Sequence, residues 1–193
     1  MTETREAQLR AATIGGPTRV DGPIVLADYD LRWPLLYERE AARVRGILGD
    51  RVLLLEHAGS TSVPGLPAKP IIDMLLVVAD SADEPTYVPA LEAGGYRLRI
   101  REPAWHEHRL FKGPDTDINL HTFSAGSSEI ARMLAFRDRL RTHDDERERY
   151  LATKRHLAAR HWVFVQDYAD AKGEVVEGIV ARGLAEDGGT APR

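Results

Sequence analysis

Residues 55–78, LEHAGSTSVPGLPAKPIIDMLLVV, form the stretch of sequence that decides the fold. We predict a short apolar strand over Val52–Glu56 and a second strand over Ile71–Ala79. The second strand is almost entirely apolar, which is typical of a strand that is covered on both faces. Small residues, Gly59 to Ser62, follow the first strand. The sequence therefore predicts an α/β protein in which this loop lies at the end of a buried strand.

The loop and the second strand together have the chemistry of a phosphate site. Small residues after a strand let backbone amides and hydroxyls approach an anion closely, so Gly59, Ser60 and Ser62 are candidates to hold phosphate oxygens. Asp73, at the start of the second strand, is placed to bind a divalent cation that bridges such a phosphate. The alternative is a Ser/Thr/Pro-rich loop with one capping aspartate, and the residues alone leave both interpretations open.

The rest of the chain supplies further strands and many helices. We predict one domain, residues 21–186, with a mixed β-sheet, flanking helices and a helical C-terminal third. Residues 1–20 are predicted to be a flexible tail with a short frayed helix, and residues 187–193 a disordered tail. The expected elements are helices over Leu31–Leu48, Thr86–Ala93 and Asp144–Arg160, an edge strand over Tyr96–Arg101, a hairpin of His108–Lys112 and Asp117–Phe123, a helix after Ser128, and an amphipathic stripe from Tyr168 to Leu184.

Composition excludes several classes of protein. The 193 residues include no cysteine, which rules out disulfides, thiolate metal sites and a cysteine nucleophile, and suits a cytoplasmic protein. No window holds 18 apolar residues, so we expect no membrane partner. The net charge of −4 argues against duplex nucleic acid as a partner, because general polyanion binders are usually basic.

Residues 59–73, GSTSVPGLPAKPIID, closely resemble the signature of the GrpB family, whose members are small proteins with a nucleotidyltransferase-like fold. The resemblance extends from Ile24 to Leu184 and implies that fold for the whole domain. Further landmarks that look like those of the family follow in order: Tyr29 with Trp33, Gly95-Tyr96, Asn119-Leu120-His121, Phe136 to Arg141, Tyr150 with Lys154, and Tyr168 with Lys172.

One position departs from the pattern of the wider superfamily. That pattern has a Gly-Ser pair, about a dozen residues, and then two carboxylates one residue apart. Here Asp73 follows Ser60 at the matching distance, but position 75 is Leu75. Two-metal nucleotidyl transfer needs several carboxylates. The resemblance therefore implies Mg²⁺ at Asp73, while Leu75 removes one of the expected ligands.

A third strand offers polar residues that can complete the site. Asp117, Asn119 and His121 alternate with apolar residues, so they share one face of the predicted strand. If this strand lies next to the one with Asp73, Asn119 is a candidate catalytic residue. His121 is then a candidate metal ligand or general base, and Asp117 a third carboxylate. The alternative is an edge strand with one solvated face.

Other candidates for contact with phosphate are cationic or precede the loop. His57 stands directly before the Gly-Ser pair, and its alternative role is to shape the loop. Arg137, Arg141, Lys154 and Lys172 fall on family-like positions, where fixed cations suit an anionic ligand; Lys69 lies within the signature. The alternative for these cations is a solvated helix surface. A further pair, His106 and His108, is predicted to be exposed and not to bind a metal.

Two functions remain open on the sequence. The first is Mg²⁺-dependent binding of a nucleoside triphosphate, or nucleotidyl transfer from it to an unknown small-molecule acceptor. The second is a non-catalytic folding-accessory or interaction domain, like the GrpB-like domain fused to dephospho-coenzyme A kinase in some bacteria. Gly59, Ser60, Asp73 and His121 favour the first function, and Leu75 favours the second.

Overall fold

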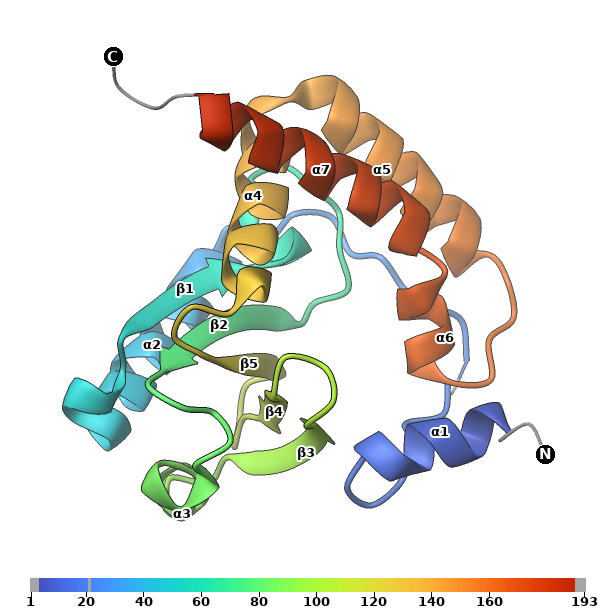
Figure 1. The fold of residues 1–193 in the computed structure, drawn as a ribbon. Helices are drawn as coiled ribbons and strands as arrows, with labels where there is room; N and C mark the ends of the chain where they lie inside the picture. Colours follow the sequence, from blue (N-terminus) through green and yellow to red (C-terminus); the bar gives the residue numbers. More distant parts are fainter. Residues whose placement is uncertain (1–3, 21, 190–193) are drawn as a thin grey trace.

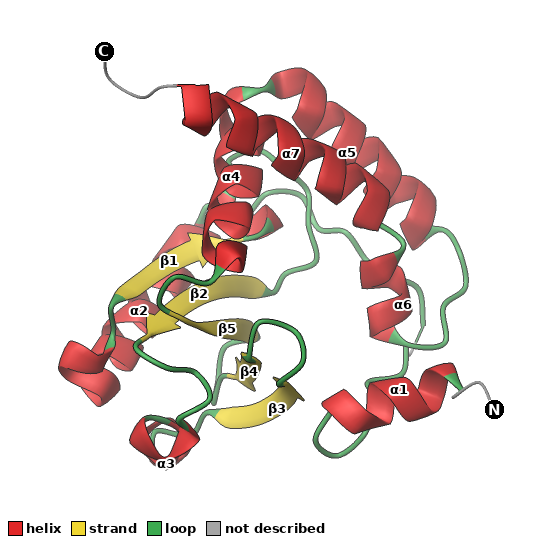
Figure 2. Ribbon diagram, viewed as in Figure 1, coloured by secondary structure: helices red, strands yellow, loops and turns green. Residues whose placement is uncertain are grey.

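The computed structural model describes residues 4–20 and 22–189. It is a mixed α/β structure, with the sheet on one side and a group of C-terminal helices above it (Figures 1 and 2). The strands are β1 (Leu54–Ala58), β2 (Ile72–Val78), β3 (Arg97–Glu102), β4 (His108–Lys112) and β5 (Ile118–Ser124). The helices are α1 (Arg5–Ala12), α2 (Arg32–Leu48), α3 (Val88–Ala93), α4 (Ser128–Thr142), α5 (Asp144–Ala158), α6 (Val165–Asp170) and α7 (Gly173–Gly189). The predicted fold class is therefore confirmed.

The five strands form one mixed sheet in the order β1-β2-β5-β4-β3. Among the strands of the described residues, β2 and β5 are the one parallel pair, and their register places Asp73 opposite Asn119 and Leu75 opposite His121. The predicted hairpin is present as the antiparallel pair β4 and β5. Strand β1 begins two residues later than predicted: after a 3₁₀ turn over Gly49–Arg51, Val52 and the bend at Leu53 lie outside the strand.

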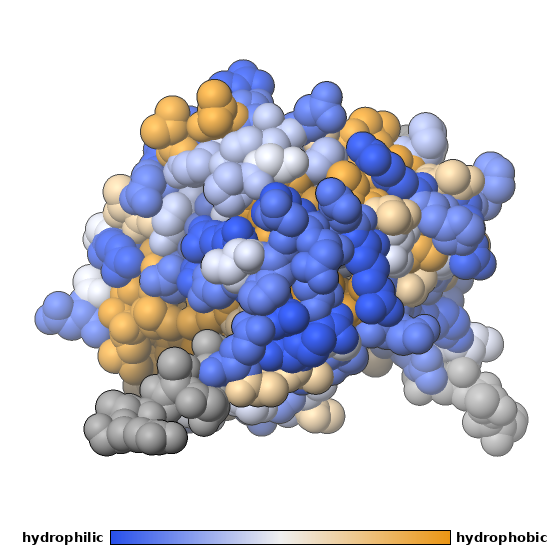
Figure 3. All heavy atoms as spheres, turned by 90° about the horizontal axis from the view of Figure 1, so that it is seen from above, coloured by the Kyte–Doolittle hydropathy of each residue, from blue (hydrophilic) through white to orange (hydrophobic). Residues whose placement is uncertain are grey.

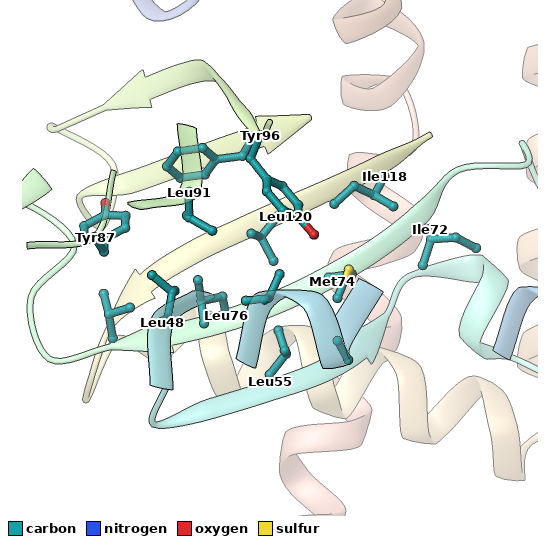
Figure 4. Close-up of a cluster of buried hydrophobic side chains, with 14 of the residues drawn as sticks. Leu48, Leu55, Ile72, Met74, Leu76, Tyr87, Leu91, Tyr96, Ile118 and Leu120 are labelled. Atoms are coloured by element: carbon teal, nitrogen blue, oxygen red, sulfur yellow. The ribbon is translucent and has the colours of Figure 1, made fainter. Parts of the chain in front are cut away.

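One face of the sheet packs against α2 and α3. Figure 4 shows the apolar side chains of β2 and β5 meeting those of the two helices. The inner side of α2 contributes Val44 and Leu48, which are almost fully buried, and Leu91 of α3 lies in the same cluster. Strand β2 is almost entirely apolar because both of its faces are buried, this one against α2 and α3 and the other against α4.

The opposite face of the sheet is covered by α4. Leu75, Val77 and Phe123 are buried there, and Met133 and Leu134 of α4 pack against them. Leu75 is fully buried in this cluster. The leucine that replaces the superfamily's second carboxylate is thus a core residue beneath α4.

A separate apolar cluster joins the loop after β1 to the helices. Val63 and Leu66 of the loop pack with side chains from α4, α5 and α7, among them Leu140, Tyr150 and Ile179. Helices α4 and α7 approach closely because residue 183 is glycine: a Cβ atom there would lie 2.9 Å from the carbonyl oxygen of Ala135. Figure 3, seen from the side of α5 and α7, shows a largely hydrophilic outer surface over these helices. The C-terminal helices thereby anchor the loop that the sequence marks as the site.

The N-terminal segment contains α1 and two isolated bridges, Thr13 with Ile100 and Arg19 with Phe164, which join it to β3 and to the start of α6. The predicted C-terminal stripe is divided into α6 and α7. Of the predicted tail 187–193, residues 187–189 belong to α7, and residues 190–193 lie outside the described residues, as do residues 1–3. Within residues 4–20 and 22–189, no helix is long and apolar enough to cross a membrane.

Candidate functional site

Gly59 and Asp73 form the base of the site, where β1 ends and β2 begins. This end of β2 faces α5 and α6 (Figure 1). Ala58 pairs with Asp73 across the sheet, and the chain then turns through Gly59 with φ 63°. A Cβ atom at Gly59 would lie 2.2 Å from Oδ2 of Asp73. Only glycine permits both the left-handed conformation and this approach. The glycine of the signature therefore lets the loop backbone contact the aspartate.

Asp73, Asn119 and His121 are brought together by the parallel register of β2 and β5. The Asn119 Nδ2 donates a hydrogen bond of 2.8 Å to Oδ1 of Asp73, and His121 Nε2 lies 3.8 Å from the same oxygen. Burial opposes ionisation of Asp73, but its contacts with His121 and Asn119 outweigh that effect and lower its pKa. Asp73 is therefore a carboxylate at neutral pH, with 29% of its side-chain surface exposed.

Asp117 lies at the margin of this group. Its carboxylate accepts a hydrogen bond of 2.7 Å from Lys112 Nζ, and the same ammonium donates to Oδ1 of Asn119 at 2.9 Å. Lys112 thus connects Asp117 to Asn119, and it is a site residue that the sequence analysis did not select. The signal that identifies it is its place in β4, two residues after Leu110, which pairs with His121, because alternate residues of a strand share one face.

Lys154 is the most deeply buried cation near the loop. Its side chain rises from α5, and Nζ donates to the Pro67 carbonyl oxygen at 2.5 Å and to Ser60 Oγ at 3.3 Å. The ammonium also lies 4.8 Å from the centre of the Tyr150 ring. Burial, together with the charge of Lys172, lowers the pKa of Lys154 to about 7. No carboxylate pairs with this ammonium among the described residues.

Lys172 and Lys69 add two further cations around Asp73. Lys172 Nζ lies 4.6 Å from the centre of the Tyr168 ring, and burial lowers its pKa although Asp73 opposes this. Burial also lowers the pKa of Lys69, and repulsion from Lys172 and Lys112 adds to the effect. We call Lys69, Lys112, Lys154 and Lys172 the lysine cluster. Positive charge exceeds negative charge at this end of the sheet.

His57 and Ser62 shape the loop from within. The His57 ring stacks on Tyr37, with ring centroids 4.8 Å apart, and its Nε2 lies 3.1 Å from Oγ1 of Thr61. Burial lowers the pKa of His57 to about 4, so the ring is neutral at pH 7. Ser62 Oγ donates to the carbonyl oxygen of Gly59 at 2.6 Å. These contacts match the alternative role of His57, which is to hold the loop.

The structure does not bring Arg137 and Arg141 into the lysine cluster. Arg137 donates to the Glu56 carboxylate at 2.8 Å and to the His57 carbonyl oxygen at 3.1 Å, and it also pairs with Asp138. Arg141 donates twice to the carbonyl oxygen of Ser62, at 3.0 and 2.9 Å. Both arginines line a separate pocket of about 320 Å³. Their guanidinium groups fasten the loop to α4.

The donors around Asp73 do not fit a resident Mg²⁺ site. Mg²⁺ prefers several charged oxygen ligands in octahedral geometry. Among the described residues, Asp73 is the one carboxylate that contacts both Asn119 and His121. Its Oδ1 already accepts a hydrogen bond, and Leu75 is buried beneath α4. Residues 4–20 and 22–189 contain no group of three or more His, Cys, Asp or Glu side chains that could hold a metal ion. A Mg²⁺ ion would therefore depend on oxygen ligands from a bound phosphate.

His108 is buried, with 3% of its surface exposed, so the prediction of an exposed His106–His108 pair is wrong for His108. Its Nε2 lies 3.1 Å from Nδ1 of His121, and its Nδ1 lies 2.7 Å from the Glu102 carboxylate. Like Lys112, it faces the site because alternate residues of β4 point to one side of the sheet. His108 and Glu102 were not predicted from the sequence, in which His106 and His108 look like a local pair.

Comparison with known proteins places the chain among bacterial relatives. The family profile described as "GrpB protein" matches residues 23–182. A UPF0157 protein of Halalkalibacterium halodurans is 58% identical over 184 residues, which are 95% of this chain and 94% of the relative. A UPF0157 protein of Streptomyces coelicolor is 44% identical over 169 residues, 88% of each chain.

More distant matches include a kinase and a solved structure. A dephospho-CoA kinase of Mycolicibacterium paratuberculosis is 30% identical over 164 residues, 72% of this chain but 40% of the kinase. The crystal structure of GrpB from Enterococcus faecalis superimposes with a TM-score of 0.74 at 32% identity and covers 84% of this chain and 98% of that one. The family match over most of the chain, together with these relatives, shows that the chain belongs to the GrpB family.

Proposed function

We propose that this chain binds a nucleoside triphosphate, with the phosphates held by the lysine cluster and by the backbone at Ser60. The observation that supports this proposal is the convergence of four lysines on one end of the sheet, where Asp73 and Asp117 supply too little negative charge. Burial lowers the pKa values of Lys69, Lys154 and Lys172, and repulsion from the charge of Lys172 lowers those of Lys69 and Lys154 further. A polyanion relieves this repulsion, because each buried ammonium then gains a charged partner.

An unsatisfied hydroxyl lies in the same region. The Tyr168 hydroxyl is buried and has no hydrogen-bond partner within the described residues, and its ring packs under the Lys172 ammonium. A buried polar group without a partner costs about 1–3 kcal/mol. A ligand oxygen near Lys172 offers a way to remove this cost.

We propose nucleotidyl transfer to a small-molecule acceptor as the reaction, with Asp73, Asn119 and His121 facing the phosphates.

Calorimetric titration tests the binding step. ATP, GTP, CTP, UTP and inorganic tripolyphosphate are titrated into the protein, each with and without Mg²⁺. We expect binding without Mg²⁺, because the donors for phosphate are ammonium groups and amides. Substitution Lys172→Met is expected to weaken the affinity about 10- to 100-fold, the effect of removing one charge-assisted hydrogen bond. The control Arg155→Met removes an exposed cation from α5 and is expected to leave the affinity unchanged.

A second candidate function is that of a non-catalytic accessory domain. Two observations favour it. Leu75 is a core residue at the position where the superfamily pattern has a carboxylate. The chain also matches 40% of the length of a dephospho-CoA kinase. If none of the four nucleotides nor tripolyphosphate binds, triphosphate binding is refuted and the accessory function is favoured. Addition of the purified protein to a dephospho-CoA kinase that lacks such a domain then tests it, with the yield of refolded kinase as the readout.

A further inference from the structure

A chain of hydrogen-bonding side chains crosses the sheet behind Asp73. It begins at Glu102 of β3, whose Oε2 lies 2.7 Å from His108 Nδ1, and continues from His108 Nε2 to His121 Nδ1 at 3.1 Å. It ends where His121 Nε2 lies 3.8 Å from Oδ1 of Asp73. We call Glu102, His108 and His121 the histidine relay. Each member comes from a different strand, so the sheet itself sets their spacing.

The relay fixes which nitrogen of each ring bears a proton. Burial lowers the pKa of His108 to about 4, so this ring is neutral at pH 7 and has one N–H group. A carboxylate only accepts hydrogen bonds, so the proton of His108 is on Nδ1, facing Glu102. His108 Nε2 is then an acceptor, and it requires a proton on Nδ1 of His121. A second proton, on Nε2, faces Asp73 and stabilises its carboxylate. When His121 gives up that proton, the ring keeps the one on Nδ1, so Nε2 is the unprotonated nitrogen of the neutral ring.

Packing prevents the His108 ring from turning away. The ring lies nearly parallel to that of Phe123, with centroids 4.9 Å apart, and meets the edge of the His121 ring, whose centroid is 5.2 Å away. Trp105 covers its edge at 5.2 Å. A ring held on three sides in a buried position keeps its two nitrogens aimed at Glu102 and His121.

We infer that Glu102 and His108 are positioning residues that hold His121 in one tautomer, and that His121 Nε2 is the proton acceptor of the site. In a Ser-His-Asp triad the aspartate holds the histidine in one tautomer. Here Glu102 has that role, and His108 lies between Glu102 and His121. The charged groups on the facing side are Asp73, whose Oδ1 lies 3.8 Å from Nε2, Lys112, which donates to Asn119, and Lys172, which interacts electrostatically with Asp73.

This inference deepens the proposed function and rests on it for the identity of the reaction. In that reaction an oxygen or nitrogen of the acceptor forms a bond to the α-phosphorus, and the bond to the pyrophosphate oxygen breaks. The acceptor's proton moves to His121 Nε2, and pyrophosphate leaves with the electron pair of the broken bond. No metal or further reactant is needed for this balance. A fixed tautomer ensures that the accepting lone pair is always directed at the site.

Nitrogen NMR of the ligand-free protein tests the inference without a substrate. Long-range ¹H–¹⁵N spectra at pH 7.5 are expected to show His121 as a single tautomer, with a protonated Nδ1 and an unprotonated Nε2. In Glu102→Gln and in His108→Phe, which keeps a ring between its aromatic neighbours, His121 is expected to become a mixture in which Nε2 is protonated. The control Glu107→Gln makes the same change on a more exposed glutamate of the preceding turn and should leave the spectrum as in the wild type.

Two results would overturn the inference: a wild-type His121 with its proton on Nε2, or an unchanged tautomer in Glu102→Gln. Glu102→Gln is a conservative substitution of a partly exposed side chain, so it keeps the test decisive if His108→Phe does not fold. A failure of the proposed function is distinguishable, because it appears as absent nucleotide binding in calorimetry and leaves the tautomer of the free protein unaffected.

Discussion

Replacement of Lys154 by methionine should stabilise the protein at pH 6 and abolish or weaken its binding of triphosphate. The ammonium is buried, with 2% of the residue exposed, and its pKa falls from the ordinary 10.5 to about 7. Below pH 7 the folded protein bears the full cost of that buried charge. The difference between the two pKa values corresponds to about 5 kcal/mol. Methionine removes this cost and fills a similar volume.

The gain is partly offset, because Lys154 also donates a hydrogen bond to Pro67. Leaving that carbonyl oxygen without a partner costs about 1–3 kcal/mol. We therefore expect a net stabilisation of about 2–4 kcal/mol at pH 6, or a rise in Tm of roughly 5–10 °C for a chain of this length. Stability gained together with binding lost is characteristic of residues that are retained for function.

The sign of the effect should change with pH. Between pH 7 and 10.5 the unfolded chain binds one proton at this lysine that the folded chain does not, so the wild type gains stability as the pH rises. Near pH 10.5 the lost hydrogen bond remains as the main effect, and Lys154→Met should be neutral or destabilising. Urea unfolding at pH 6 and pH 10 measures both values, with Arg155→Met as the exposed control. A variant that is destabilised to the same extent at both pH values would refute the reasoning.

Three further outcomes follow from the geometry. Gly59→Ala should cost at least 1–2 kcal/mol in urea unfolding, because its left-handed φ and the contact of its Cβ with Asp73 are both unfavourable; a neutral effect would contradict the close packing of loop and aspartate. Asp73→Asn should leave Mg²⁺-free affinity for tripolyphosphate unchanged or higher in calorimetry, since a negative charge facing the anion is removed, and a loss of that binding would show that the carboxylate is needed for it. Acid should destabilise the protein between pH 6.5 and 4, because His57 and His108 have pKa values of about 4 when folded and bind fewer protons than in the unfolded chain; this contributes up to about 3 kcal/mol for each, and His57→Gln should reduce the slope of stability against pH measured in that window.

Much of the fold was predictable because its signals are local. The apolar run of β2, the turn residues 113–115 and the helical patterns after Ser128 each match an element of the structure. The start of β1 was misplaced because Val52 and Leu53 are as apolar as the strand that follows, and periodicity does not distinguish a 3₁₀ turn before a strand. The break between α6 and α7 interrupts one continuous apolar stripe, and so it leaves no signal in that pattern.

The site was only partly predictable, because it depends on contacts between distant strands. The sequence offered the pairing of β2 with β5 only as one of two alternatives, and the structure has this pairing, which explains how Asp73 meets Asn119 and His121. Lys112 was missed because its role follows from the position of β4 beside β5. Arg137 and Arg141 occupy family-like positions, yet spacing along a helix cannot tell a cation that binds a ligand from one that binds the Ser62 carbonyl oxygen.

The most direct test of phosphate binding by the lysine cluster is the titration of Lys154 itself. The pKa of its side chain can be followed by NMR of the Cε and Nζ atoms, in the free protein and with saturating inorganic tripolyphosphate. The account predicts a value near 7 in the free protein and a clear rise toward the ordinary 10.5 with the anion bound, because the ammonium gains a negative partner. A pKa that stays the same when tripolyphosphate is added would contradict the proposal that this cluster holds the phosphates.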